Sequence, residues 1–449
     1  MIKITTRAGT AIMTQIKTTT VKTLKHSLLA LSLLSSFNLL AQTQVIHAGT
    51  LLQVAGEKPI TKQTIVITDG KITSIQKGFI GADSIEKGAE LIDLSSSFVM
   101  AGLMDMHVHL QGELGPKNDS QSLRMSDADV LMQSAFNAKK TLMAGFTTVR
   151  DLGAKAEQIF ALRDGIAKGW IDGPRIMAAG TSVSVTGGHG DVDGLSPDIL
   201  EMRTSKTVCD GPFDCRRATR QAIKFGADVI KITSTGGVLS DTNTGTGQQM
   251  ADDELKEVVD AAHALGRKVA SHAHAADGIN AALRAGVDSI EHGSYANKES
   301  IKLFKKTGAY LVPTLMAGDT VVGLAKNTNF MSDAIKAKAI RVGADMTANF
   351  KNSFKSGVKI AYGTDSGVSP HGNNGKEGVL MAQAGMKNSD ILVAATINAA
   401  DLIGMSDSLG TLAQGKIADI IAFDGNPLQN IEELLDVDFV MKGGKVIKN

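Results

Sequence analysis

At residues 102–109 the chain reads GLMDMHVH, an apolar run that ends in a pair of histidines. In a β-strand, side chains two positions apart point to the same side, so His107 and His109 share one face. Two imidazoles on one face form a ready chelate for a borderline metal such as zinc. A His-x-His pair also occurs as surface decoration, so the rest of the chain has to decide between the two interpretations.

The central part of the chain repeats this kind of segment. Short apolar runs that end in polar residues alternate with helical stretches, which favours a parallel α/β sheet. Eight such strands predict a (β/α)₈ barrel, in which active sites lie at the C-terminal strand ends. An open doubly wound sheet is disfavoured, because the chain lacks a glycine-rich phosphate fingerprint between a strand and a helix. The expected strands cover residues 99–109, 147–151, 175–181, 228–233, 268–274, 288–292, 310–314 and 359–365.

Both ends of the chain carry hairpin patterns. Apolar segments flank an Asp69-Gly70 turn near the start and a Gly443-Gly444 turn near the end. We therefore expect one small β lobe made of residues 42–100 and 407–449, with the barrel in residues 101–406.

The first residues are typical of a targeting segment. Two lysines precede an apolar run over residues 27–41, which is short and interrupted by serines, unlike a membrane span. This predicts that residues 1–41 form a signal cleaved near Ala41, and that the protein is secreted or periplasmic without stable membrane insertion. An oxidising compartment would permit a disulfide between Cys209 and Cys215, with two free thiols as the alternative.

The composition excludes several classes of protein. Lys and Arg number 47 against 46 Asp and Glu in 449 residues, so there is no basic field that would attract nucleic acid. Two cysteines are too few for a thiolate zinc cluster, and any metal must use other ligands. Aromatic residues make up only 4%, which disfavours a stacking pocket for a nucleobase. We expect a small-molecule substrate of another kind.

Four more expected strands carry polar residues that a metal could use. The fourth contains Lys231, the fifth ends with His272 and His274, the sixth with His292 and the eighth with Asp365. Each has a plain alternative: a hydrogen-bonded core histidine, a lysine that reaches solvent, or an aspartate that caps a helix. All of these would have to hold at once, so the set predicts a metal site at the barrel mouth. Burial would favour the neutral amine of Lys231, to which CO₂ can add to give a carbamate that bridges two metals.

In this order, the motifs resemble the amidohydrolase superfamily, specifically its imidazolonepropionase-like branch, which contains metal-dependent dipeptidases of the prolidase type. The resemblance covers nearly the whole mature chain and implies a (β/α)₈ TIM barrel joined to a β-sandwich formed by both chain ends. It is carried by residues 102–109 and by Thr147-Thr148-Val149-Arg150-Asp151, Ile230-Lys231-Ile232, Ser271-His272-Ala273-His274, Ile290-Glu291-His292-Gly293 and Gly363-Thr364-Asp365.

The resemblance also implies a binuclear centre. Six side chains would hold two divalent ions, with zinc expected, and a hydroxide would bridge the ions. On the fifth strand, His272 matches the ligand position of the family's motif, and His274 is left either to contact the substrate or to support a ligand. The six are His107, His109 and Asp365 at one ion, His272 and His292 at the other, and carboxylated Lys231 (N6-carboxylysine) between them.

Further residues are expected to serve catalysis and substrate binding. Two metals would lower the pKa of the bridging water, and Asp365 is placed to take its proton and pass it to the leaving amine. The resemblance implies that His189 holds the substrate, and an exposed histidine on a glycine-rich loop is the alternative. Tyr295 is a weaker candidate donor. Arg150 either pairs with Asp151 or clamps a substrate carboxylate.

We expect hydrolysis of the amide bond of dipeptides or N-acyl amino acids. Hydrolysis of a cyclic amide, lactone or ester on the same site is the alternative, because a fold alone does not separate these reactions. A secreted binding protein would predict a damaged ligand set, and no position is damaged. A mononuclear deaminase relative would need an acid after the fifth strand, where Asp277 is not a convincing match. The loop at 204–215 is expected either to cover the mouth or to contact another subunit of a homo-oligomer.

Overall fold

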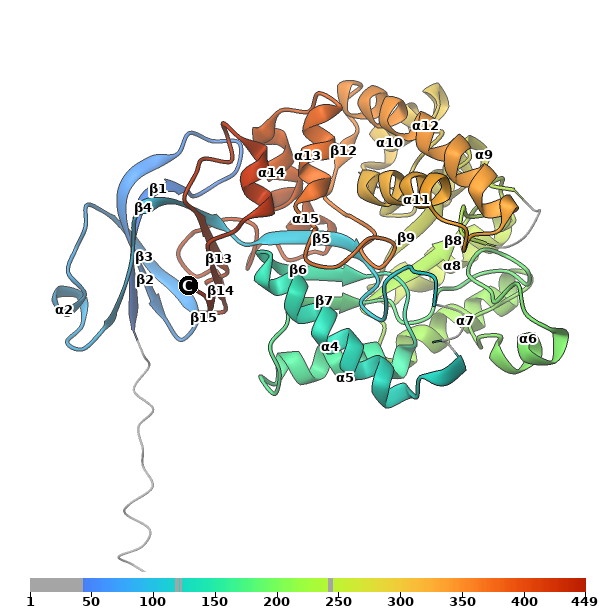
Figure 1. Cartoon of the computed structure of the whole chain (residues 1–449), viewed down its shortest axis with the longest axis horizontal. Helices are drawn as coiled ribbons and strands as arrows, with labels where there is room; N and C mark the ends of the chain where they lie inside the picture. Colours follow the sequence, from blue (N-terminus) through green and yellow to red (C-terminus); the bar gives the residue numbers. More distant parts are fainter. Residues whose placement is uncertain (1–42, 118–120, 122, 241–244) are drawn as a thin grey trace, which may run out of the picture. The chain divides into compact units, whose positions relative to one another are not determined.

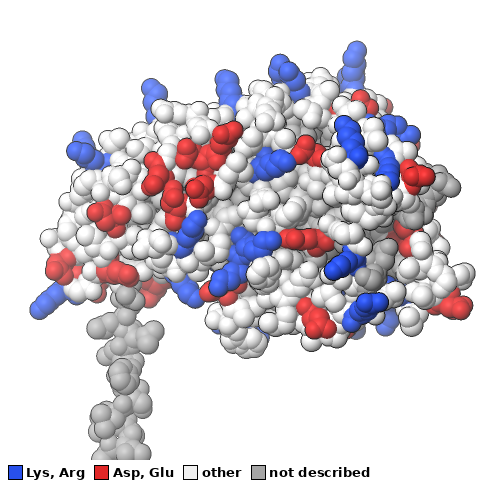
Figure 2. All heavy atoms as spheres, in the orientation of Figure 1, with Lys and Arg blue, Asp and Glu red and all other residues white. Residues whose placement is uncertain are grey.

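The computed structural model describes residues 43–117, 121, 123–240 and 245–449 (Figure 1). The expected signal segment lies outside these residues. No helix within the described ranges is long and apolar enough to cross a membrane. Figure 2 shows basic and acidic side chains mixed across the face that it draws, so no single sign of charge covers that face.

Eight parallel strands form the predicted barrel. Three pair in the order β5-β6-β7 and five in the order β12-β11-β10-β9-β8. Parallel bridges join the two groups at both seams, between Val108 and Ser366 and between Val183 and Ile232. The strands are β5 (Leu103–Val108), β6 (Phe146–Asp151), β7 (Arg175–Ala178), β8 (Val229–Thr233), β9 (Lys268–Ala273), β10 (Ser289–His292), β11 (Tyr310–Val312) and β12 (Lys359–Ile360).

Helices separate successive strands of the barrel, and Figure 1 shows them on both sides of it. The connection from β11 to β12 differs from the others because it contains two long helices, α11 (Leu315–Asn327) and α12 (Asp333–Lys355), which pack against each other. The remaining helices are α4 (Asp127–Met143), α5 (Ala156–Ala167), α6 (Pro197–Arg203), α7 (Pro212–Phe225), α8 (Asp252–Ala264), α9 (Ala276–Ala285), α10 (Lys298–Thr307), α13 (Lys376–Gln383), α14 (Asn388–Ala394) and α15 (Ile397–Leu402).

The first expected strand, 99–109, is in fact two strands. Its first three residues end β4 (Glu90–Ala101), which belongs to the small lobe, and the barrel strand starts at Leu103. Gly102 separates the two strands, and a Cβ there would lie 2.4 Å from the Thr147 hydroxyl oxygen, so the close approach of β6 requires glycine. The seventh strand is also shorter than expected: it ends at Val312, and Thr314, with φ +51°, is the residue directly before α11.

The small lobe contains strands from both chain ends, as predicted. They form one seven-stranded sheet in the order β15-β14-β13-β4-β1-β2-β3, with β4 between parallel β1 and antiparallel β13. Ala418 donates to Gly70 O and accepts from Gly444 N, so the two predicted turns lie close together. A sandwich of two facing sheets stays a prediction. The remaining elements are β1 (Gln44–Leu52), β2 (Ile60–Thr68), β3 (Lys71–Lys77), β13 (Ile420–Phe423), β14 (Phe439–Lys442), β15 (Lys445–Lys448), the short helix α2 (Ala82–Ile85) and the 3₁₀ turn η1 (Ile431–Leu435).

The start of α11 is held by a buried carboxyl group. Glu377 of α13 accepts hydrogen bonds from Leu315 N (2.9 Å) and Met316 N (2.7 Å), two of the unpaired donors of the first helical turn. Burial nevertheless dominates, and it raises the pKa of Glu377 from its usual 4.5 to about 8. The folded protein therefore keeps a proton on this group at neutral pH.

This raised pKa predicts a pH-dependent stability. The unfolded chain releases the proton of Glu377 near pH 4.5 and the folded protein near pH 8, so the stability present below pH 4.5 is lost as pH rises through that window. Glu377→Gln has no group that titrates at this position, so its stability should not fall in this window. Between pH 5 and 8, we expect its free energy of unfolding to rise relative to that of the wild type by on the order of a few kcal/mol. Thermal denaturation at matched metal content measures the difference. Glu57→Gln, at an exposed position, is the control, and equal pH slopes in all three proteins would contradict the prediction.

Candidate metal centre

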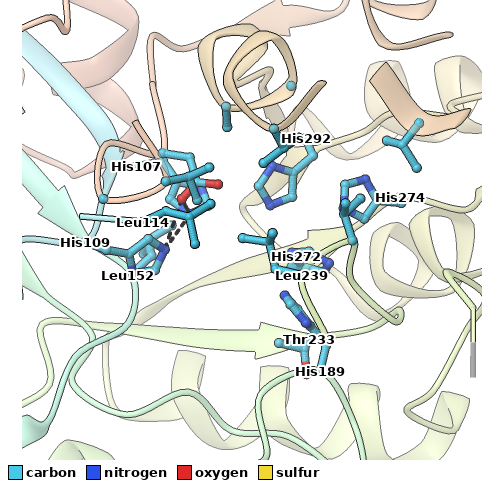
Figure 3. Close-up of a pocket in the computed structure, with 18 of the residues that line it drawn as sticks. His107, His109, Leu114, Leu152, His189, Thr233, Leu239, His272, His274 and His292 are labelled. Atoms are coloured by element: carbon cyan, nitrogen blue, oxygen red, sulfur yellow. Dashed lines mark hydrogen bonds and ion pairs between the residues drawn. The ribbon is translucent and has the colours of Figure 1, made fainter. Parts of the chain in front are cut away.

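A cavity of about 440 Å³ opens where the barrel strands end, and six histidines line it (Figure 3). All six side chains expected to hold metal are among its lining residues, as are the expected substrate contacts His189 and His274. The lining side chains of this set are His107, His109, His189, Lys231, His272, His274, His292 and Asp365.

Three potential ligand atoms converge on one point between β5 and the end of the eighth barrel strand. His109 Nε2 lies 3.3 Å from His107 Nε2 and 3.2 Å from Asp365 Oδ1, and His107 Nε2 lies 3.6 Å from the same oxygen. Ligands about 2.0–2.1 Å from a tetrahedral zinc ion are about 3.3 Å apart, so these three atoms fit a shared ion.

A second group of histidines adjoins the first. Ligand nitrogens of His272, His274 and His292 lie within 4.8 Å of one another, and His292 forms a similar group with His107 and Asp365. His292 therefore lies within ligand distance of residues from both sides of the cluster. The choice between His272 and His274 as ligand stays open in this geometry, because both rings face His292, with centroids 4.6 and 4.9 Å away.

In three of the imidazoles, Nδ1 lies within hydrogen-bond distance of an oxygen atom. His107 Nδ1 donates to Glu291 Oε2 at 2.9 Å and His109 Nδ1 to Gly153 O at 2.8 Å, while His292 Nδ1 lies 2.7 Å from Thr314 Oγ1. A carbonyl and an ionised carboxylate only accept, so the first two rings carry the proton on Nδ1 and turn the Nε2 lone pair to the cluster. This is the arrangement that orients metal-binding histidines.

Burial keeps most of the histidines neutral, which is the form that binds metal. His109 is the exception, because the hydrogen bond to Asp365 and the charge of that residue outweigh burial and raise its pKa. Burial lowers the pKa of His107 to about 4, and it lowers the pKa values of His272 and His292 well below the usual range. Burial likewise lowers the pKa of Lys231, against the opposing charges of Glu291 and Asp365. A neutral amine is what addition of CO₂ requires.

The position of Arg150 corrects its predicted role. Its side chain is only 1% exposed and does not line the cavity. It pairs with Glu291 at 2.9 Å and not with Asp151, and it also donates to Met106 O and the hydroxyl of Ser289. Arg150 therefore supports the carboxylate that holds His107, and it is too deep to clamp a substrate.

Tyr295 is not a lining residue either. It packs against a cluster of apolar side chains that includes Val321 and Val342, two residues of the cavity wall. The ring therefore backs the wall, which corrects the expectation that Tyr295 donates to a substrate.

The loop that carries His189 is anchored on three sides. His189 Nδ1 lies 2.7 Å from Ser240 Oγ, and its ring packs 4.1 Å from that of His272. Ser184 Oγ accepts from Gly190 N, while Ser184 O accepts from Cys209 N. The structure contains the disulfide between Cys209 and Cys215, which ties Cys209 to α7, so the residue that bonds to the His189 loop is itself fixed.

Asp105 ties the two strand ends that meet at the first group of ligands. Its carboxylate accepts from His107 N, from the backbone and hydroxyl of Thr364, and from Asn374 Nδ2. Burial raises its pKa to about 6. Sequence reasoning assigned no role to Asp105, Glu291 or Thr314; the first two adjoin predicted ligands in the quoted motifs, which is a signal of position and not of role.

Comparison with known proteins identifies the family. A model of the amidohydrolase family matches residues 98–447. Among curated proteins, ochratoxinase from Aspergillus niger is 33% identical over 432 residues, which cover 91% of this chain and 87% of that protein. Imidazolonepropionase from Fusobacterium nucleatum is 22% identical, over 85% of this chain and 91% of that protein.

Solved structures agree with the sequence matches. A Xaa-Pro dipeptidase with bound methionine in the active site is 39% identical, with a TM-score of 0.86 over 91% of this chain and 100% of that one. A prolidase complexed with N-methylphosphonate-L-proline is 30% identical, with a TM-score of 0.82 over 91% of this chain and 100% of that one. Family membership and a TIM-barrel-like fold follow from these matches.

The buried contacts of Glu291 generate a prediction for the metal site. In Glu291→Gln, Arg150 loses its counter-charge and His107 loses its carboxylate partner, so we expect a loss of about 3–5 kcal/mol in stability and about 10–100-fold in zinc affinity. Thermal denaturation and zinc titration of the purified variant measure the two effects.

Two further variants separate these effects. Glu299→Gln removes an exposed pair with Arg284 and is expected to change neither quantity appreciably. Arg150→Met combined with Glu291→Gln removes both buried charges, and it should recover stability without recovering zinc affinity. Wild-type zinc affinity in Glu291→Gln would contradict the orienting role of Glu291.

Proposed function

Because the chain belongs to the amidohydrolase family, we propose that it hydrolyses the amide bond of dipeptides or N-acyl amino acids at a binuclear metal centre. Membership in this family makes it a hydrolase that acts on C–N bonds. The observation that carries the finer proposal is one cavity lined by histidine, lysine and aspartate side chains from five barrel strand ends.

The chain's own atoms support a pair of ions. The three ligand atoms of the first group have the mutual spacing of a tetrahedral site, and Asp365 Oδ1 is buried without a hydrogen bond of normal geometry among the described residues. When bound, divalent ions such as zinc would activate water and polarise the scissile carbonyl. The residues that would hold them are His107, His109 and Asp365 at one ion, His272 and His292 at the other, and carboxylated Lys231 at both.

Asp365 is the residue that moves the proton. Burial opposes its ionisation, but the adjacent His107 and His109 outweigh burial and hold the pKa of its carboxyl below the usual range. The group is thus ionised at neutral pH, although the lowered pKa makes it a weaker base than an ordinary carboxylate. Its place beside His107 and His109 is what supports its proposed role, to accept a proton from the attacking water and pass it to the leaving amine.

His189 and His274 bind the substrate in this proposal. Burial lowers their pKa values to about 3 and about 4, so both rings are neutral. Each has its Nδ1 beside a serine hydroxyl, Ser240 for His189 and Ser294 for His274, and keeps a second nitrogen for the substrate. A neutral imidazole has one donor nitrogen and one acceptor nitrogen, so each ring can form a hydrogen bond with an amide or a carboxylate of the substrate.

The names of similar proteins support a dipeptide. This chain matches the solved structures of a Xaa-Pro dipeptidase and of a prolidase over the whole length of those structures, at 39% and 30% identity. Export is a further part of the proposal. The disulfide between Cys209 and Cys215 supports it, because such bonds persist in oxidising compartments.

Amine release from a library of dipeptides and N-acyl amino acids tests the reaction. Purified protein reconstituted with zinc and bicarbonate is expected to cleave members of this library and to leave lactones and esters of the same acids largely intact. Protein shown to hold two metals that cleaves no amide in the library, but opens a cyclic amide, lactone or ester, would overturn the proposed substrate class.

Removal of Lys231 tests the bridging carbamate. Lys231→Ala is expected to lose tight binding of the two-metal set and to lose activity at least about 10³-fold, because one carboxylate would serve both ions. Metal analysis measures the first effect, and ¹³C NMR after growth with labelled bicarbonate should show a carbamate signal in the wild type and none in Lys231→Ala. Lys268→Ala, at the opposite end of neighbouring β9, is the control. Retention of both metals and full rate in Lys231→Ala would disprove the bridge.

A further inference from the structure

The wall of the cavity away from the metal ligands is built by the two-helix connection of α11 and α12. Val321 of α11 and Ala339, Val342 and Met346 of α12 line it, and each is at most 6% exposed. The two helices pack against each other as a hairpin, and the residues that this hairpin presents to the cavity are apolar. This hairpin supplies space and apolar surface, and no hydrogen-bonding side chain.

Two glycines let α11 and α12 pack closely at the cavity wall. Gly318 and Gly343 line the cavity, and a Cβ on Gly343 would lie 2.3 Å from Val322 Cγ2. A Cβ on Gly318 would lie 2.7 Å from Met346 Sδ. The glycines therefore let the helices approach each other while they leave backbone, and no side chain, at the cavity surface.

The charge of the lining selects against ionic groups. Among the described lining residues, the charged ones are Lys231 and Asp365 of the metal site and Glu113, which pairs with Lys140 at 2.9 Å. Lys338 of α12 is buried, but its ammonium donates to the carbonyls of Gly237 and Ser240. A basic or acidic group placed against the hairpin would lose its hydration without gaining a counter-charge, whereas an apolar one gains from burial.

The hairpin is fixed relative to the metal ligands. Thr314, whose hydroxyl lies 2.7 Å from His292 Nδ1, is the residue directly before α11. Lys338 joins α12 to the loop that presents Ser240 to His189. An apolar group bound to the hairpin would thus lie at a fixed distance from the candidate metal ligands and from His189.

We propose that the α11–α12 hairpin forms a pocket that selects a substrate with a bulky apolar side chain next to the scissile amide. This inference rests on the proposed amide hydrolysis. It names the class of side chain, and it makes Ala339 and Val342 residues that determine specificity.

A matched substrate series tests the selection. Two sets of dipeptides are needed. In the first set only the residue before the scissile amide varies, and in the second only the residue after it. The variable residue is Gly, Leu, Phe, Lys or Asp. On one of the two sides, kcat/KM for Leu or Phe is expected to exceed that for Gly by about 10–200-fold, with Lys and Asp below Gly.

Variants of the hairpin locate the pocket. Ala339→Leu fills it and is expected to lower kcat/KM for the Leu and Phe substrates about tenfold or more, with the Gly substrate changed by less than about threefold. Val342→Ala enlarges it and should move the preference toward Phe, which keeps the test valid if the first variant folds poorly. Ile340→Ala is the control, since Ile340 is 47% exposed, on α12, and outside the lining.

The outcomes separate the two proposals. If no amide is cleaved by metal-loaded protein, the proposed function fails. If amides are cleaved without preference for apolar side chains, or if the control and Ala339→Leu behave alike, the pocket is wrong while the proposed function stands.

Discussion

The ion pair between Arg150 and Glu291 lies beneath the histidine cluster, and the geometry of the cluster depends on it. Both side chains are essentially inaccessible to water, with exposures of 1% and 0%. Burial of two charges is costly unless hydrogen bonds satisfy the remaining donors and acceptors. Here Ser289, Met106 O and His107 satisfy them, so that residues of β5, β6 and β10 are connected across the barrel interior. Burial acts to raise the pKa of both Glu291 and Asp105. At Glu291 the charge of Arg150 and the hydrogen bond with His107 outweigh burial and lower the pKa to about 2, whereas at Asp105 the donors are neutral and burial raises the pKa to about 6.

The cluster above this pair is prepared for a cation before one binds. Burial opposes protonation of His272 and His292, and Asp365 supplies negative charge and raises the pKa of His109 beside it. Three residues at strand ends adopt positive φ, His292 at +70°, Asp365 at +56° and Thr314 at +51°. Such conformations are unfavourable for residues with a Cβ and persist where surrounding contacts enforce them. The hydrogen bonds of Thr314 to His292 and of Asp365 N to His107 O are contacts of that kind.

The barrel and the gathering of the ligands could be predicted because both follow local rules. Period-two spacing places His107 and His109 on one face, and parallel strands bring Lys231, His292 and Asp365 to one mouth. The role of Arg150 could not be predicted, since its partner lies 141 residues away and Asp151 is the nearer carboxylate in sequence. The boundary between two strands at Gly102 could not be predicted for a related reason. The apolar run continues across it, and only the packing of Thr147 shows that one strand ends there and another begins.

Side-chain roles that depend on tertiary packing were likewise beyond the sequence. Tyr295 follows a predicted ligand closely enough to suggest the site, yet its ring is directed into the apolar cluster behind the wall. The α11–α12 hairpin gives an apolar helical pattern that any core helix would share, so nothing local marks it as part of the cavity.

The small sheet imposes an order on assembly. β4 lies between β1 and β13, so a strand made near the start of the chain keeps an unpaired edge until residues 420–423 have been synthesised. β4 also continues through Gly102 directly into the first strand of the barrel. Barrel closure, which uses residues up to 366, can therefore precede completion of the sheet. The last thirty or so residues act as the closing piece of the fold, and a chain that lacks them would expose the β4 edge to other strands, with aggregation as the consequence.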